Sequence, residues 1–530
     1  MKNWFSNSLF AIWIGSLISG GDSFGRSASD GLNCLNQVDL KCAQDIRDEL
    51  LQRQPNNDEV VQLLRRTLFH EGHYADLKAL LESEAQNGET TEDTGGYPYL
   101  ATVEAFEGMV VSTGKAVEVR HDPGIDRILA GEAIEVLEES RSTYDTLFGG
   151  GPDHDIVLDI FPTAKRFMMA SGLPPESVRT TGVIALSKWN RLLLTSPRST
   201  SRGYAWKDTT AHEYIHLVVA WRTKDNAPVW LQEGLAKYLE AAWRGERKNY
   251  LSAYQMSLLA KAIRDDSFVP FEKFARSMAY LDSSEEAALA FAQVATMVAF
   301  MQSKAGDSGF TSLMDGLRSG RSAEDMVSSL SGYSDFNEFL SAWKAYIRMI
   351  PLIQEELAEL PVNLDGAGED FDDDPLLGAR QDLAKFARLG DLLLEADRPK
   401  AALIEYKKAI DEDEPPSPSI FARRSQCHMA LGDVGAAQQL IDEGVRLYPE
   451  FPMLLKSAGD VYRALNQPEK SIAFYRSAHD INPYQVELQQ LLISQYEASG
   501  QSKMADHHRY IQEILKAGGA YAVPPSNGEE

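Results

Sequence analysis

The spacing of apolar residues divides the middle of the chain into a part with strands and a part with helices. Between Ile125 and Leu147, apolar side chains recur every three or four positions, which predicts a helix with one buried face. Short apolar runs bounded by Gly and Pro predict strands at 108–119, 155–161, 182–187 and 191–196. A helical pattern then continues from Asp208 to about Ile350. Strands followed by helices predict an α+β domain, which we place at residues 105–355.

The last third of the chain repeats itself. Gly432, Asn466 and Gly500 lie 34 residues apart, and Pro449 and Pro483 keep the same step. Small residues at fixed positions allow two helices to pack closely, and Pro ends the second helix of a unit. The pattern resembles the tetratricopeptide repeat. This resemblance implies an all-α solenoid over residues 381–517, with three good units and a degenerate terminal one.

A weaker copy of such a unit occurs nearer the N-terminus. Glu59–Glu82 has the pattern of two amphipathic helices joined around Gly72. We therefore predict an N-terminal helical region at residues 30–100. Whether this region is repeat-like stays open.

The first residues have the composition of an export signal. Lys2 supplies a positive start, Leu9–Ile18 is a short apolar core, and small residues follow. We predict a signal peptide at residues 1–28, with a retained anchor or a plain helix as alternatives. The remaining chain has no run of eighteen apolar residues, which predicts no stable membrane span after signal cleavage.

The three cysteines bear on the compartment. Cys34 and Cys42 lie eight residues apart just after the predicted signal, where a disulfide could form in an oxidising compartment. Two unpaired helical thiols are the alternative. Cys427 falls within a repeat helix, where we expect a buried free thiol.

Acidic residues outnumber basic ones. The 78 Asp and Glu against 52 Lys and Arg give a net charge of -26, which repels phosphate backbones and argues against a nucleic-acid partner. Six acidic residues lie between Leu360 and Pro375. We predict an acidic linker at residues 356–380, with a calcium-binding loop as the alternative. A disordered tail is predicted at 518–530.

The segment Asp208–Trp221 carries the candidate chemistry. His212 and His216 are four residues apart, so both imidazoles lie on one face of a helix and can reach one metal ion. Glu213 follows the first histidine and is placed to act on water as a general base. Asp208 is in position to cap the start of this helix.

A second helix offers a third ligand. Glu233 comes seventeen residues after His216, in a segment that Pro228 can open and that has an apolar face. Two neutral imidazoles and one carboxylate suit Zn²⁺ and leave a position open for water. We predict one zinc ion per chain, bound by His212, His216 and Glu233. The alternative is two hydrogen-bonded core histidines and a surface glutamate.

These motifs are similar to those of a known enzyme family. H-E-x-x-H at 212–216 and P-x-W-L-x-E-G-L-A around Glu233 resemble the peptidase MA-like branch of the gluzincin metallopeptidases. The resemblance implies a small mixed sheet with a helical subdomain, and a zinc-dependent hydrolase with a peptide or protein substrate. In such an enzyme zinc activates water, and Glu213 carries a proton to the leaving amine.

Two features depart from the family pattern. Lys237 stands where an acidic residue that orients a zinc histidine is common, so Glu240, Asp208 or backbone would have to take that role. Phe291 stands where a Tyr or His donor for the oxyanion is expected. The substitutes are Tyr204 and Tyr280.

Other conspicuous residues are expected to be structural. His70–Tyr74 is predicted to be a repeat turn, and His507 and His508 are predicted to be a solvated pair. Core positions are predicted for Trp206, Trp221, Trp230 and Trp243. We expect the strand at Arg191–Ser196 to be an edge strand, beside which an extended substrate would pair.

The sequence therefore supports two functions. The first is an exported zinc metallopeptidase, in the bacterial periplasm or cell envelope, whose repeats recruit a substrate or a protein partner. The alternative is an inactive peptidase-fold scaffold whose repeats bind a partner protein. The complete set of ligands and base favours the first.

Overall fold

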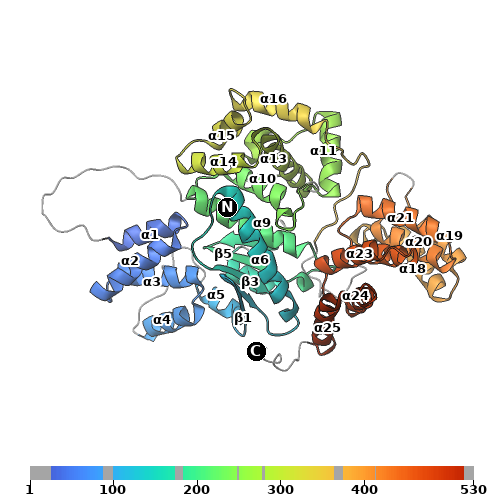
Figure 1. Ribbon diagram of the computed structural model, residues 1–530, viewed down its shortest axis with the longest axis horizontal. Helices are drawn as coiled ribbons and strands as arrows, with labels where there is room; N and C mark the ends of the chain where they lie inside the picture. Colours follow the sequence, from blue (N-terminus) through green and yellow to red (C-terminus); the bar gives the residue numbers. More distant parts are fainter. Residues whose placement is uncertain are drawn as a thin grey trace.

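The computed structural model describes residues 26–86, 99–173, 183–247, 250–276, 278, 281–362, 374–411 and 414–518. A central domain lies between N-terminal helices on one side and the repeats on the other (Figure 1). The predicted export signal and tail fall almost entirely outside these residues, as do residues 363–373 of the predicted acidic linker. Within the described part of the chain, no helix is long and apolar enough to cross a membrane.

The central domain is built on a mixed five-stranded sheet with the order β1-β2-β3-β5-β4. β2, β3 and β5 are parallel, and the outer strands β1 and β4 are antiparallel to their neighbours. The strands are β1 Val110–Gly114, β2 Val117–His121, β3 Ile156–Phe161, β4 Ala185–Lys188 and β5 Arg191–Thr195. The predicted edge strand at Arg191–Ser196 is therefore wrong, because β4 pairs along the outer side of β5.

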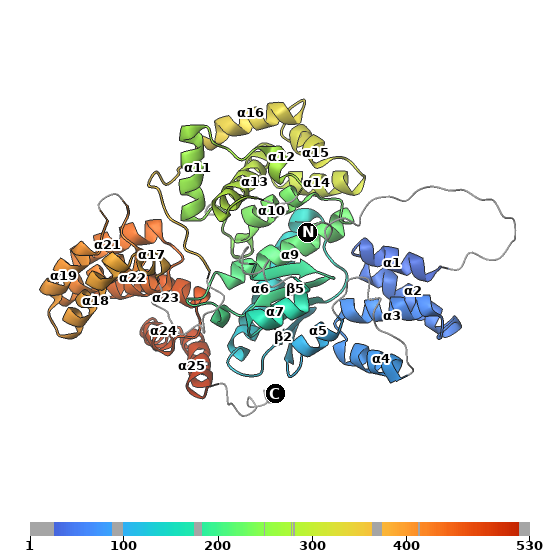
Figure 2. The same cartoon turned by 180° about the vertical axis from the view of Figure 1, so that it is seen from behind.

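Helices cover both faces of this sheet. On one face lie α6 (Arg127–Phe148) and α9 (Trp206–Thr223), and on the other lies α7 (Ala164–Ser171) (Figures 1 and 2). Side chains alternate along β5 as a pleated strand requires. Leu192 and Leu194 join the core with α6 and α9, whereas Leu193 joins the core with α7.

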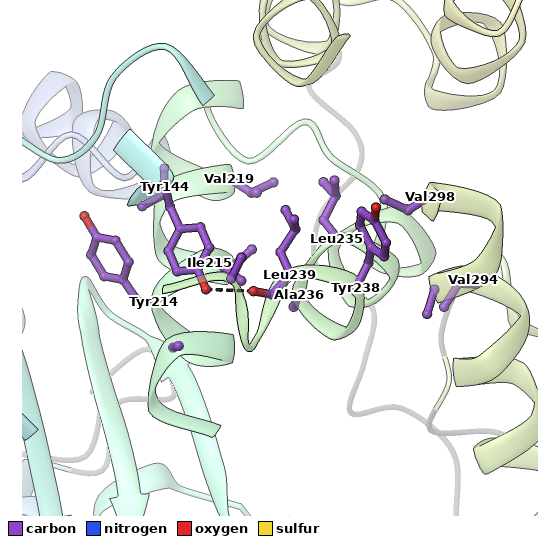
Figure 3. Packing of buried hydrophobic residues seen from close by; sticks show 14 of the residues in the cluster. Tyr144, Tyr214, Ile215, Val219, Leu235, Ala236, Tyr238, Leu239, Val294 and Val298 are labelled. Carbon is purple, nitrogen blue, oxygen red and sulfur yellow. Dashed lines mark hydrogen bonds between the residues drawn. The ribbon is translucent and has the colours of Figure 1, made fainter. Parts of the chain in front are cut away.

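A helical subdomain follows α9. Its first helix, α10, packs closely on α13, since a Cβ at Gly234 would lie 2.8 Å from the Val294 carbonyl oxygen. Leu235 and Tyr238 of α10 face Val298 of α13 in the same core (Figure 3). The elements are α10 Val229–Leu239, η2 Ala242–Arg244, α11 Ala253–Asp265, α12 Phe271–Phe274, α13 Ser284–Ala305, α14 Ser308–Arg318, α15 Ala323–Leu330 and α16 Phe336–Ile347.

The C-terminal helices form the predicted solenoid of helix pairs. Two of the small residues allow close packing within a pair, since a Cβ at Gly390 or Gly459 would lie 2.4 or 2.3 Å from the ring of Tyr406 or Tyr475 in the second helix. The repeated Gly432, Asn466 and Gly500 have another role: each has a positive φ in the turn between the two helices of a pair. Cys427 is buried and free, as predicted. The helices are α17 Pro375–Gly378, α18 Gln381–Glu395, α19 Pro399–Lys408, α20 Pro418–Ala430, α21 Val434–Leu447, α22 Pro452–Ala464, α23 Pro468–Ile481, α24 Val486–Ala498 and α25 Ser502–Lys516.

The N-terminal region is helical, and a disulfide joins its first two helices. Cys34 and Cys42 are bonded, with their Cα atoms 5.8 Å apart, a separation typical of disulfides. The two helices predicted around Gly72 are α3 and α4, and Gly72 ends α3 with φ of +71°. The helices are α1 Ala28–Asn36, α2 Leu40–Arg53, α3 Asp58–Glu71, α4 Tyr74–Gln86 and α5 Tyr99–Ala105.

These N-terminal helices pack against the sheet around a buried arginine. Arg191 is paired with Asp159 at 3.1 Å, and its guanidinium lies 5.0 Å from the ring centre of Phe69. His70 is 5% exposed, and its Nδ1 lies 3.2 Å from the side-chain nitrogen of Asn190. Burial lowers the pKa of His70 to about 3, and the positive charges of Arg191 and Arg66 act in the same direction. His70 is therefore neutral at neutral pH where it packs in this interface.

The repeats dock on the central domain through the loop between α23 and α24. The backbone N–H of Tyr204 donates to the carbonyl oxygen of Ile481 at 3.1 Å. Gly203 has φ of +86°, and a Cβ there would lie 2.2 Å from the same carbonyl oxygen. Only glycine permits this approach. The contact lies on the segment that leads from β5 into α9.

Tyr484 strengthens the same contact. Its hydroxyl is 2.8 Å from both Asp126 and Ser196, and Asp126 pairs with Arg198 at 2.9 Å. The end of β5 is therefore tied to the repeats by side chains as well as by backbone.

A buried polar network completes this interface. Glu132 of α6 accepts hydrogen bonds from His479 at 2.9 Å and from His507 at 3.1 Å. His508 is 2% exposed, and its Nδ1 lies 2.7 Å from the side-chain oxygen of Gln489. The predicted solvated pair is therefore wrong for His508, which is buried within the repeats, whereas the His507 side chain remains 38% exposed and reaches Glu132 of the central domain.

Candidate metal centre

The two predicted histidines converge with Glu233 on one point. His212 and His216 lie on one face of α9, with their ring centres 4.9 Å apart. The Nε2 atoms of both rings are 3.5 Å from the same oxygen of Glu233 on α10. The three side chains are 15–22% exposed, so the group is held by the fold and still open to solvent.

The position of Glu233 depends on how α10 is anchored. The Tyr144 hydroxyl on α6 donates to the carbonyl oxygen of Leu239 at 2.7 Å, at the end of α10 (Figure 3). It also accepts a hydrogen bond from the backbone of Trp243 at 3.3 Å. Pro228 precedes the first residue of α10, as predicted from the sequence. Both ends of the short helix are thus defined.

The three donors fit a zinc ion. Their ligand atoms all lie within 4.8 Å of one another, and two imidazoles with one carboxylate are a zinc donor set that leaves a coordination position free. Burial would lower the pKa of His212, but hydrogen bonds with Glu233 and Glu240 raise it to about 10. The surroundings of the histidines therefore favour a positive charge at this point.

Glu213 follows His212 on α9 and reaches the neighbouring strand β4. It is 8% exposed, and its carboxylate accepts a hydrogen bond from the backbone of Ser187 on the edge strand β4. Burial raises the pKa of Glu213, while the charges of His216 and His212 lower it in part. A carboxylate with a raised pKa between the histidines and an edge strand can accept and return a proton.

Comparison with known proteins agrees with this geometry. The family model of the peptidase MA superfamily matches residues 145–349, which contain α9 and α10. This chain carries a peptidase MA superfamily domain. A tetratricopeptide-repeat model matches residues 457–485, from within α22 to the loop after α23. The curated proteins contain no match to the chain.

Solved structures resemble parts of the chain weakly. Leukotriene A4 hydrolase from Saccharomyces cerevisiae is 12% identical with a TM-score of 0.33, over 77% of this chain and 66% of that chain. MamA is 18% identical with a TM-score of 0.22, over 29% of this chain and 87% of that chain. The two family models and the sheet describe a mixed-sheet peptidase MA domain followed by repeats.

The peptidase MA domain orients His212 through Glu240. The Oε2 atom of Glu240 lies 3.2 Å from Nδ1 of His212, and its Oε1 atom pairs with Lys237 at 2.5 Å. Of the three sources considered from the sequence, Glu240 therefore takes the place of the missing acidic residue. Lys237 does not contact a predicted ligand but holds Glu240.

Asp208 has a different position from the one predicted. α9 begins at Trp206 after the capping residue Ala205, so Asp208 lies inside the first turn. Its carboxylate accepts from the Trp243 indole at 3.0 Å and pairs with Arg244 at 2.6 Å. The prediction of Asp208 as the cap is wrong, because its carboxylate instead bonds Trp243 and Arg244 of η2.

The candidates for an oxyanion donor are mostly occupied or apolar. The Tyr204 hydroxyl is buried and donates to the carbonyl oxygen of Thr195. Phe291 has no donor, and Tyr280 lies outside the described residues. The predicted core positions of Trp206 and Trp230 are confirmed, since both are fully buried.

Proposed function

We propose that the chain is an exported zinc-dependent metallopeptidase. The observation that carries the proposal is the convergence of His212, His216 and Glu233, with Glu213 between them and the edge strand β4. The peptidase MA domain supports a hydrolase of the peptidase type.

The residues of the site have three different roles. His212, His216 and Glu233 would hold one zinc ion, which supplies Lewis-acid chemistry by lowering the pKa of water and polarising a carbonyl. Glu213 accepts the proton of the water that attacks the peptide carbonyl, and returns it to the leaving nitrogen. Glu240 keeps His212 in the orientation that presents Nε2.

An extended substrate would bind along β4. This strand pairs with β5 on one side, and among the described residues no strand pairs with its other side. Backbone hydrogen bonds to such an edge can hold a peptide in line with Glu213. The edge-strand mode of binding predicted from the sequence is kept, but on Ala185–Lys188.

The location and the partners follow from the flanking regions. The signal-like segment with Lys2 and Leu9–Ile18 supports export, and the Cys34–Cys42 disulfide supports an oxidising compartment such as the bacterial periplasm. The repeats would bring a protein substrate or partner to the enzyme.

Zinc content and cleavage of a peptide library test the proposal together. Wild-type protein should contain about one zinc per chain and cleave peptides. Glu213→Gln should keep the zinc and lose about 10²–10⁴-fold in kcat, because only the proton carrier is removed. His216→Ala should lose both.

Two outcomes would refute the proposal. Wild-type protein without zinc after supplementation would exclude the metal site. Zinc binding without any cleavage, and a cellular function unaffected by Glu213→Gln, would favour the inactive scaffold whose repeats bind a partner.

A further inference from the structure

A cavity of about 740 Å³ lies between the start of α9 and the repeats. The peptidase domain contributes Asp208 and Trp243 to its wall, and the repeats contribute Pro449, Glu450 and Ile481. A second cavity of about 250 Å³ also has Pro449 and Glu450 in its wall. The larger volume is in the range of ligand pockets, and Glu450 lies where the two cavities meet.

The larger cavity is connected to the predicted metal ligands through Asp208 and Glu450, although His212, His216 and Glu233 do not line it. Asp208 lies one turn before His212 on the same face of α9. Glu240, which bonds His212, is paired with Lys237, and Glu450 interacts electrostatically with both Lys237 and Glu240. A group bound in the cavity would therefore lie close to the residues that hold and orient the metal.

Glu450 differs from the other charged residues of the larger cavity. Those other residues are ion-paired, namely Lys207 with Asp480, Arg244 with Asp208, and Arg446 with Glu355. Glu450 is exposed and, among the described residues, has no hydrogen bond or ion pair through its carboxylate. Glu450 is therefore the acidic residue of this wall without a direct partner among the described residues, and the positive charges of Lys237, Arg202 and Arg244 lie near enough to act on it.

Much of the remaining wall is apolar or aromatic, with Trp243, Tyr250, Met256, Ile350 and Val445. Lys and Arg side chains combine an apolar stem with a cationic head, which matches an apolar wall that ends at a carboxylate. We propose that this cavity is a substrate subsite, built jointly by the peptidase domain and the repeats. It takes a Lys or Arg side chain of the peptide near the bond that is cut, and Glu450 pairs with the cation.

This subsite rests on the proposed peptidase function and gives the repeats a direct part in substrate selection. In the recruiting role, the repeats only raise the local concentration of a substrate. In the subsite, a repeat residue decides which side chain is accepted.

The test measures peptide binding to the full chain carrying Glu213→Gln, in which cleavage is blocked. The probes are fluorescein-labelled decapeptides of alternating Ala and Ser, with Lys placed at each position in turn and norleucine as the uncharged counterpart. At the favoured position, the Lys peptide should bind about tenfold more tightly than the norleucine peptide, and less so at high salt.

The variants locate this preference. Adding Glu450→Gln should remove it, and Glu450→Lys should shift it to peptides with Glu at the same position. Glu469→Gln is the matched control, because Glu469 is an exposed carboxylate of α23 that does not line either cavity. This control should leave the preference unchanged.

The outcomes separate the subsite from the proposed function. Equal binding of Lys and norleucine peptides, no binding at all, or a Lys preference that survives Glu450→Gln would overturn the subsite. Cleavage of the same peptides by wild-type protein is scored separately. Cleavage without a basic preference refutes only the subsite, and a Glu450-dependent preference without cleavage refutes only the peptidase activity.

Discussion

Replacing Glu240 by alanine is expected to weaken zinc binding by about 10–100-fold without abolishing it. The Glu240 carboxylate accepts a hydrogen bond from Nδ1 of His212 at 3.2 Å, and the two side chains are 18% and 16% exposed. A hydrogen bond to a charged group in such surroundings is worth about 1.5–3 kcal/mol. The expected loss of affinity corresponds to about 1.4–2.7 kcal/mol, which agrees with this range.

Lys237 adds a second contribution to the same experiment. Without Glu240, the Lys237 ammonium loses its 2.5 Å partner and repels a dication nearby. Lys237→Met in the Glu240→Ala background should therefore recover part of the affinity. Glu240→Gln keeps an oxygen for Nδ1 and should lose less than about tenfold.

The assay is a competition titration of zinc against a chromophoric chelator, using the full chain at neutral pH. Glu246→Ala is the control, because Glu246 is an exposed carboxylate with no contact to His212. An unchanged dissociation constant for Glu240→Ala would refute the reasoning, since His212 would then keep its orientation without this partner.

Three further predictions concern stability and docking. Tyr144→Phe leaves the buried carbonyl of Leu239 without its donor, so urea denaturation should give a free energy of unfolding lower by about 1–3 kcal/mol, and an unchanged midpoint would contradict this. In the folded protein the pKa of His70 is lowered from 6.5 to about 3. As the pH falls below 6.5, His70 is therefore protonated in the unfolded chain but not in the folded one, and the free energy of unfolding decreases until about pH 3. His70→Asn, which cannot be protonated, should show a shallower fall of melting temperature with acid than wild type; parallel curves would count against this role. Gly203→Ala places a methyl group against the Ile481 carbonyl, so limited proteolysis should release the repeats faster while circular dichroism shows both parts folded; an unaltered digestion pattern would exclude the tight contact.

The convergence of His212, His216 and Glu233 was predictable because its geometry is mostly local. The spacing of His212 and His216 places both rings on one face of any helix, and the structure has that helix. Glu233 follows after one short connection, so few arrangements of the second helix are possible. Glu240 could be named only as one of three candidates, because the choice depends on how α10 ends.

The errors in the prediction concern contacts between distant segments. β4 precedes β5 in the chain but lies outside it in the sheet, and the order of residues does not contain that information. His508 looked exposed because its buried partner Gln489 lies on another helix, 19 residues earlier. Asp208 looked like a cap because its partners, Trp243 and Arg244, come from a later turn.

The docking contacts have a consequence for how the repeat region can change in length. The array touches the peptidase domain through α21, the α23–α24 loop and α25, whereas α18 and α19 lie farthest from it (Figures 1 and 2). The array is therefore attached to the peptidase domain toward its C-terminal end, and its first helices extend away from that domain. Gene duplications that add units before α18 would lengthen the array and leave these contacts intact, whereas loss of a unit after α22 would remove contacts made by α23, α25 or the loop after α23. Natural variation in the number of units should thus accumulate at the α18 end.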